Sequence, residues 1–431
     1  MQSGTIFRFT NDISLSTDVV LPYKVILQFC GGKITKDTSI IDAVTITADY
    51  TIIEAAPYQI FENITISGLW NCDHAYFEWF GALGDGRTDD RAHIQEALDS
   101  STFPDFFLLN KTYMINSHYV SSDVTESDAI GLSINRHVQI VGQSWSTIST
   151  CSNDIQFNVL VQINSSGVGL TGFNITGNNP YHDATNQIQE LLATRHITAS
   201  DDNHDYNSLS LIGMGITSCV KNCVNLNTFL SHLENVTTGW SETGFIIRGF
   251  LTAASIITRT STTLSGCYCS HCTKYGYKLM EMTYCLLQNC AVDFSNALSP
   301  LSDTDRSDGN PCTFGCPYYF LYCSSISLIA CGCEVSKNIM YLNHCQCIKI
   351  DTLSHWYDPN ESYPNTDKDQ PRRIYISNCN SINFSQCVMG TDDPFISTHN
   401  EQNIGFNGCL VRTSNGSVSG TLISAALINH V

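Results

Sequence analysis

The chain has few positive charges and no long apolar run, and each shortage excludes a class of protein. Lys and Arg total 21 against 40 Asp and Glu, which gives a net charge of -19. Phosphate binding needs clustered positive charge, so we expect no nucleic-acid partner. No stretch approaches the roughly eighteen consecutive apolar residues of a membrane span, so we expect no membrane insertion. The start of the sequence also lacks the basic and apolar pattern of a secretion signal.

Residue pairs that form tight hairpin turns are scarce as well, apart from Asp85-Gly86 and Asn415-Gly416. An antiparallel sandwich needs such turns between its strands, so this shortage argues against one. Ser, Thr and Asn are abundant instead, and 42% of residues are hydrophobic while only 14% are charged. This balance is typical of many short strands joined by polar turns.

Twenty cysteines are present, mostly inside short apolar runs. Members two apart, such as Cys331 and Cys333, lie on the same face of a strand. We interpret them as small buried hydrophobic residues rather than as a disulfide framework. The alternative is a zinc site at Cys267-x-Cys269-x-His271-Cys272 or between Cys312 and Cys316, but neither has a paired second half. We therefore expect no zinc at these cysteines and no cofactor, with calcium as the one possible ion.

A loose repeat begins near Leu209 and places a cysteine after a small or amide residue in successive units. Where no long loop intervenes, the period is about twenty residues. A unit of that size cannot bury its own apolar face, so neighbouring units must stack. The pairs are Asn222-Cys223, Gly266-Cys267, Asn289-Cys290, Ala330-Cys331, Gln386-Cys387 and Gly408-Cys409.

A glycine-rich turn that leads into a short helix, residues 79–100, is the most distinctive stretch. It reads Trp-Phe-Gly-Ala-Leu-Gly-Asp-Gly-Arg-Thr-Asp-Asp, and Thr88, Asp89 or Asp90 can accept hydrogen bonds from the first free helical N–H groups. The predicted helix spans 91–100, where the apolar spacing of Ile94, Ala97 and Leu98 gives one buried face.

This turn-and-helix order resembles the pectate-lyase-like right-handed β-helix superfamily, and it is most similar to bacteriophage tailspike and receptor-binding proteins. The pieces Leu27–Ile34 and Tyr58–Phe61 resemble the leading coils of such proteins from gut Bacteroidales bacteria and their phages. The resemblance implies an all-β, single-stranded right-handed parallel β-helix with a short capping α-helix near residues 90–100. Homologous tailspikes are trimers, so it also implies a homotrimer.

We predict three parts along the chain. They are N-terminal β coils at 1–79, the signature turn and capping helix at 80–100, and the main β-helix at 101–431 with side loops at 178–206, 298–316 and 355–373. Within the first loop, the composition near Gln187 to Leu192 predicts a short helix.

Paired carboxylates at Asp392 and Asp393 are the catalytic candidates, because glycoside hydrolysis uses two carboxyl groups. Their local sequence resembles the paired-aspartate motif of polygalacturonase-type β-helix hydrolases. The remaining elements of that motif are absent from this sequence. The alternative is an ordinary turn before Pro394.

Three further polar stretches have weaker chemical interpretations. Residues 201–205 concentrate titratable groups but are typical of a solvated loop. Residues 303–309 resemble a calcium loop, so calcium is possible, yet the glycine falls one place late and no glutamate closes it. A lyase would need a basic residue, for which Lys349, Arg372 and Arg373 are the candidates.

Aromatic residues at Trp356, Tyr357 and Tyr363, followed by Arg372 and Arg373, form the predicted substrate-binding site. Sugar rings stack on aromatic side chains while polar groups hold their hydroxyls. The alternative is that these aromatics fold back over the coil. Trp240 and His232 are additional candidates for lining a groove.

We therefore interpret the chain as a phage tailspike or receptor-binding protein that recognises bacterial surface polysaccharide. An active depolymerase, hydrolase or lyase, and a structural virion component without glycan binding are the alternatives. Expected partners are the polysaccharide, a homotrimer and other phage tail proteins. The expected location is the virion, assembled in the reducing host cytoplasm, with an extracellular bacterial protein as the alternative.

Overall fold

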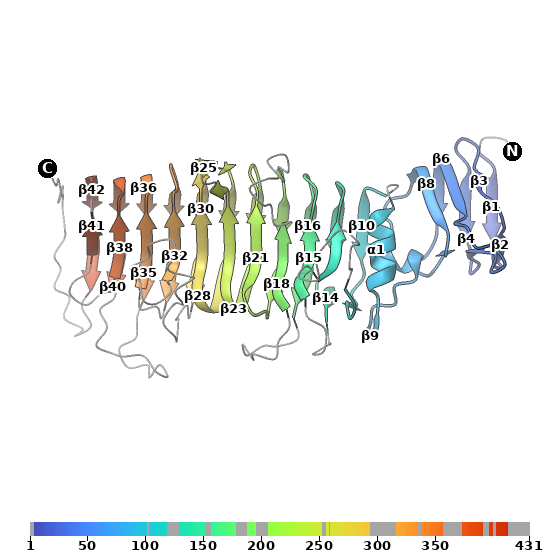
Figure 1. Cartoon of the computed structure of the whole chain (residues 1–431), viewed down its shortest axis with the longest axis horizontal. Helices are drawn as coiled ribbons and strands as arrows, with labels where there is room; N and C mark the ends of the chain where they lie inside the picture. Colours follow the sequence, from blue (N-terminus) through green and yellow to red (C-terminus); the bar gives the residue numbers. More distant parts are fainter. Residues whose placement is uncertain are drawn as a thin grey trace. The chain divides into compact units, whose positions relative to one another are not determined.

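The computed structural model describes most of the chain, and the chain divides into two units, Met1–Asn178 and Asn179–Val431. The strands of each unit stack as successive coils (Figure 1). Both the all-β class and the right-handed parallel β-helix are confirmed. The described ranges are 4–100, 103–118, 129–150, 157–177, 188–194, 206–251, 256–257, 259–293, 316–334, 338–356, 373–390, 396–399 and 402–412.

The first coils of unit 1 form a five-stranded and a three-stranded parallel sheet. Equivalent residues stack from coil to coil, as Phe9 does on Phe29 with ring centroids 4.7 Å apart. The first sheet contains β1 (Ile6–Phe9), β4 (Ile26–Phe29), β6 (Thr45–Glu54), β3 (Val19–Val20) and β8 (Thr65–Asn71). The second contains β2 (Ile13–Leu15), β5 (Ile34–Lys36) and β7 (Phe61–Glu62).

The capping segment consists of the 3-10 helix η1 (Phe77–Phe80), strand β9 (Asp85–Asp89) and helix α1 (Arg91–Asp99). The predicted apolar face of α1 is buried, with Ile94, Ala97 and Leu98 at most 3% exposed. Asp89 Oδ1 accepts the Arg91 N–H at 3.2 Å, as the first free N–H requires. Asp90 does not cap the helix, because its carboxylate turns back toward the glycine-rich loop.

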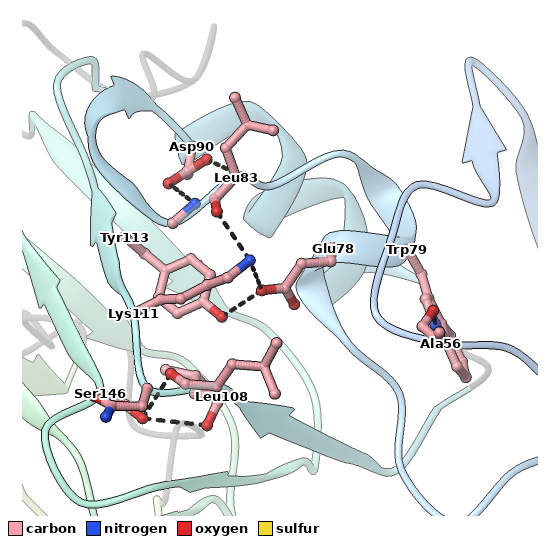
Figure 2. A network of polar contacts seen from close by, with 12 residues as sticks. Ala56, Glu78, Trp79, Leu83, Asp90, Leu108, Lys111, Tyr113 and Ser146 are labelled. Atoms are coloured by element: carbon pink, nitrogen blue, oxygen red, sulfur yellow. Dashed lines mark hydrogen bonds and ion pairs between the residues drawn. The ribbon is translucent and has the colours of Figure 1, made fainter. Parts of the chain in front are cut away.

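Figure 2 shows how polar groups hold this capping segment. Asp90 accepts the Leu83 N–H at 2.6 Å and the Gly84 N–H at 3.1 Å. Glu78, 3% exposed, accepts hydrogen bonds from Lys111 Nζ at 2.9 Å and from the Tyr113 hydroxyl at 2.8 Å. Because these contacts join the turn to β11, we assign them a structural role in fixing the turn, although Glu78 Oε2 has no partner among the described residues.

The later coils of unit 1 have three parallel walls whose interior is filled by aliphatic side chains. Ile140, Ile148 and Leu170 line a small apolar void with Ile94 of α1. The walls contain β10 (Asp105–Leu108), β13 (Gln139–Gly142) and β16 (Gly169–Thr171); β11 (Thr112–Met114), β14 (Thr147–Ser149) and β17 (Asn174–Thr176); and β12 (Ile130–Ile134) and β15 (Phe157–Ile163).

Unit 2 repeats the same three walls, and we call them the first, second and third walls in chain order within a coil. The first contains β19 (Ser210–Ile212), β22 (His232–Glu234), β27 (Thr263–Ser265), β30 (Leu286–Gln288), β33 (Ser327–Ile329), β36 (Gln346–Asp351), β39 (Asn380–Ser385) and β42 (Gln402–Asn407).

The long strands β23 (Thr237–Arg248) and β28 (Tyr268–Met280) turn from the second wall into the third. The second wall also contains β20 (Gly215–Thr217), β31 (Ala291–Asp293), β34 (Gly332–Glu334), β37 (Ser354–Trp356), β40 (Val388–Gly390) and β43 (Leu410–Arg412). The third also contains β18 (Ile188–Thr194), β21 (Asn222–Asn227), β32 (Cys316–Leu321), β35 (Asn338–Asn343), β38 (Arg373–Ser377) and β41 (Ile396–His399).

Four short strands lie outside these walls. An antiparallel pair is formed by β24 (Phe250–Leu251) and β25 (Ile256–Ile257), and a parallel pair by β26 (Arg259–Thr260) and β29 (Met282–Thr283).

Left-handed residues mark the corner between the first and second walls. Gly266, Asn289 and Ala330 have φ of +61°, +51° and +53°, and each N–H donates to a carbonyl of the next coil. The cysteine that follows each corner points inward and is at most 2% exposed. The small-or-amide residue before cysteine is therefore a corner residue in five of the six predicted pairs, since Gln386 and Gly408 also have positive φ. The pair Asn222-Cys223 is the exception, because Asn222 begins β21 on the third wall.

The interpretation of the cysteines as buried hydrophobic residues is confirmed for most of them. Of the 18 described cysteines, all are free thiols and 15 are buried. Cys30 and Cys347 are exposed and Cys72 is intermediate. Cys347 departs from the face of Cys345 because its own φ is +56°, which interrupts the alternation of side chains near the start of β36.

The helix predicted near Gln187 to Leu192 is wrong. Strand β18 occupies Ile188–Thr194, and it pairs in parallel with β21 so that Leu192 lies opposite Val224. The division of the chain at residues 79 and 100 stays a prediction.

Candidate functional site

The predicted catalytic and binding residues fall largely outside the described part of the chain. Asp392, Asp393, Tyr357, Tyr363 and Arg372 all lie outside the described residues, and their proposed roles stay predictions. The acidic stretches 201–205 and 303–309 also lie outside them.

Only the backbone of two predicted binding residues is described. Trp356 ends β37, where it pairs with Glu334, and Arg373 begins β38, where it pairs with Asn338. The two residues therefore belong to different walls, the second and the third.

The structure separates the other candidates. Lys349 lies on the first wall, with its side chain 55% exposed and its Nζ 3.9 Å from Asp351. His232 lies on the same wall, 3.1 Å from Glu234 Oε2. Trp240 lies instead at the corner between the second and third walls, where β23 turns.

The third wall has side chains that point outward, away from the interior of the coil. Tyr318 points inward, because its hydroxyl donates to the Gly332 carbonyl at 2.7 Å across the coil. Its neighbour Tyr319 therefore points outward, in register with Lys278 on one side and Tyr341 on the other. Outward residues on this wall form rows across the coils.

Tyrosines dominate the part of this face beyond β28. Tyr275, Tyr319 and Tyr341 are at most 2% exposed, and successive ring centroids lie 4.8 and 4.9 Å apart. They form a second hydrophobic cluster with Cys316 and Leu321, outside the coil. Lys278 Nζ lies 4.9 Å from the Tyr275 ring centroid and 5.1 Å from that of Tyr319, which is within cation–π range.

Charged and amide side chains occupy the neighbouring part of the same face. We call this group the outer polar cluster, and it consists of Glu190, Asn222, Asn225, Arg248, Lys278 and Glu281. Glu190 is fixed by its neighbours in the next coil, because its Oε1 accepts Asn222 Nδ2 at 2.5 Å and Asn225 Nδ2 at 2.7 Å.

Half-buried Arg248 and buried Glu281 lie at the centre of the outer polar cluster. Burial lowers the pKa of Arg248, while the charges of Glu190 and Glu281 act in the opposite direction. Glu281 is 5% exposed, and burial raises its pKa to about 7 despite the nearby positive charges of Arg248 and Lys278. A carboxyl group with this pKa exchanges a proton near neutral pH, which is what general acid–base chemistry requires.

An aromatic pair lies at the corner where the same two strands enter the third wall. Trp240 stacks on His271 of the next coil, with ring centroids 4.0 Å apart and planes inclined by 12°. Both residues are partly exposed corner residues with positive φ. From Thr243 to Arg248 the strand extends roughly 17 Å at about 3.3 Å per residue. The aromatic pair and Arg248 therefore lie at opposite ends of the third-wall part of β23.

No group of three His, Cys, Asp or Glu side chains converges as a metal site within the described ranges. In the Cys267-to-Cys272 stretch, Cys269 and Cys272 sulfurs lie 3.1 Å apart, but His271 turns to the Trp240 ring. The described helices include none that is both long and apolar enough to span a bilayer.

Sequence reasoning missed the outer polar cluster because its members lie far apart in the chain. Glu190, Arg248 and Glu281 belong to no recognisable motif, and only the coil-to-coil register brings them together. Trp240, in contrast, was found from its aromatic character alone.

No protein-family model and no curated protein sequence matches the chain. Several solved structures do match it. The enzymatically active domain of tailspike protein 2 from bacteriophage CBA120 matches at a TM-score of 0.50 and 14% identity, covering 79% of this chain and 47% of that one. The tailspike of Acinetobacter phage vb_AbaP_AS12 matches at a TM-score of 0.46 and 13% identity, covering 84% of this chain and 66% of that one. PfbA, a surface adhesin of Streptococcus pneumoniae, matches at a TM-score of 0.48 and 11% identity, covering 79% of this chain and 92% of that one.

The likeness to the CBA120 domain shows the fold alone, a right-handed parallel β-helix. The chain spans about half the length of the CBA120 domain, with 47% of it covered.

Proposed function

We propose that this protein is a tailspike-type protein that binds bacterial surface polysaccharide on the outer face of β23 and β28. One observation carries the proposal. A partly exposed tryptophan–histidine stack lies at the corner where β23 and β28 enter the third wall, and half-buried charges together with the buried Glu281 lie toward the far end of the same strands. Aromatic faces and fixed polar groups are the two elements that sugar recognition needs.

The test is retention of capsular polysaccharide from gut Bacteroidales on the immobilised full chain. We expect Trp240→Ala to weaken retention at least tenfold, because it removes the exposed ring of the stack. Trp145→Ala is the matched control, since Trp145 is 79% exposed but belongs to unit 1 and to no strand of this face. Equal retention by both variants would refute the placement of the site.

Hydrolysis of the bound polysaccharide is the second candidate function, favoured by the buried Glu281 and the hydrogen-bonded Glu190 on one face. Glycosidases use one carboxylic acid and one carboxylate in this way. New reducing ends in the retention experiment would support it. The earlier candidates Asp392 and Asp393 are tested by the same assay on their Asn variants.

The remaining partners follow from the tailspike proposal. We infer a homotrimer that attaches to other phage tail proteins and is located in the virion after assembly in the host cytoplasm. Sedimentation equilibrium of the purified chain tests the trimer, and a monomer would count against it.

A further inference from the structure

Two cysteines of β28, Cys269 and Cys272, lie in contact inside the coil, and we call them the corner pair. Their sulfur atoms are 3.1 Å apart, which is about 1 Å longer than a disulfide bond. Residues three apart in a straight strand point to opposite faces. Here His271, with φ of +54°, turns the strand between them. Both thiols therefore point into the interior, where they are at most 1% exposed.

The preceding coil makes the same corner without thiols. Thr238 and Ser241 lie in register with the corner pair, and Trp240 between them has φ of +56°. Both hydroxyl side chains are completely buried. Small hydroxyl side chains thus fit the interior at this corner, so packing does not require a thiol at either position.

Other buried cysteines face each other across successive coils. Cys267 and Cys290 lie at equivalent positions of neighbouring coils, as do Cys387 and Cys409. Side chains in parallel register have Cβ atoms about as far apart as the strands, about 4.8 Å. A disulfide bond needs a Cβ separation of about 3.5–4.5 Å. The strand spacing does not limit the corner pair, because both of its residues belong to one strand, so we expect this pair to be oxidised first.

We propose that Cys269 and Cys272 form a disulfide bond when the protein meets a small-molecule disulfide of the glutathione type. One protein thiolate attacks a sulfur of this oxidant, forms a mixed disulfide and releases one small thiol. The second protein thiolate then attacks the protein sulfur of the mixed disulfide and releases the second small thiol. The two protein thiols thereby lose two electrons and two protons, and the oxidant is reduced to two thiols.

Burial determines when this reaction takes place. It raises the pKa of the Cys272 thiol, so little thiolate is present while the coil is closed. The oxidant therefore reacts when the corner opens locally, or before the coil closes during folding. The resulting bond closes a ring that contains His271, whose side chain stacks on Trp240. Oxidation thus fixes the corner that positions the aromatic pair.

The experiment brings the full chain to equilibrium with buffers of graded ratio of oxidised to reduced glutathione. Cys30→Ser and Cys347→Ser are introduced first, because these exposed thiols form mixed disulfides. Acid quenching, alkylation in denaturant and peptide mapping then identify the oxidised cysteines. We expect the corner pair to be oxidised at ratios that leave Cys267 and Cys290 reduced.

The same titration in denaturant measures what the fold contributes. We expect half-oxidation of the corner pair in the native chain at a roughly tenfold lower ratio, because a disulfide that fits the fold stabilises it. Cys269→Thr with Cys272→Ser reproduces the side chains of the preceding corner. The melting temperature of this double variant should not depend on the ratio, whereas that of the parent chain rises on oxidation.

Three results overturn the inference. They are a corner pair that stays reduced at every ratio, a corner pair that is oxidised in denaturant but not in the native chain, and earlier oxidation of Cys267 with Cys290. The titration of the parent chain decides among these results even if the double variant fails to fold. None of them bears on the proposed function, which the retention experiment tests separately.

Discussion

Replacing Glu281 by glutamine tests the electrostatics of the outer polar cluster directly. The pKa of Glu281 in the folded protein is about 7, raised from 4.5 by burial. Because the folded value lies above the unfolded one, the neutral carboxyl stabilises the fold fully below pH 4.5, and this stability is lost as pH rises through 7. A rise of that size corresponds to roughly 3 kcal/mol of unfolding free energy. Glutamine stays neutral, so the variant avoids this loss.

The assay is urea unfolding of the wild type and Glu281→Gln at pH 4.5 and pH 8.5. We expect the stability of the variant relative to the wild type to increase by roughly 3 kcal/mol between the two pH values. Glu234→Gln is the control, because its side chain is 45% exposed and its substitution should give a much smaller pH-dependent difference. If the Glu281 variant follows the wild type at both pH values, Glu281 is ionised in the fold and the reasoning is wrong.

Four further outcomes are expected. Arg248→Gln raises the pKa of the Glu281 carboxyl further, because it removes a nearby positive charge, and NMR titration of that carboxyl measures the change. Ala330→Gly stabilises the chain by about 1 kcal/mol in urea unfolding, because φ is +53° there. Leu98→Ala destabilises the chain by about 2–5 kcal/mol, since this side chain lies on the buried face of α1. Alkylation of the native protein, followed by peptide mapping, labels exposed Cys30 and Cys347 first.

The β-helix was predictable because its repeat can be recognised in short stretches of the sequence. A corner residue followed by an inward cysteine recurs at Asn289-Cys290 and Ala330-Cys331, and the structure places both pairs at equivalent corners. The capping helix was predictable for the same reason, since the apolar spacing of Ile94 and Leu98 matches the face it buries.

Strand β18 shows where local sequence is insufficient. Its residues Gln189 to Ala193 include glutamine, glutamate, leucine and alanine, which all favour helix. Pairing with β21 overrides that preference, because Leu191 and Leu192 are buried within the stack of coils and Glu190 gains two amide donors. The stabilisation of this strand comes from contacts with neighbouring coils, and the sequence of one segment gives no information about those contacts.

Glu281 differs from the residues at equivalent corners by carrying a buried carboxyl group. It has φ of +53°, and the equivalent corner residues of the next two coils, Tyr322 and His344, both have φ of +52°. The backbone conformation therefore does not distinguish Glu281. Its burial does, because Glu281 is 5% exposed whereas Tyr322 is half-buried and His344 is exposed. Desolvation that raises the pKa of a carboxyl group is typical of functional sites, so a glutamate at a β-helix corner is a feature by which such a site can be sought in sequence.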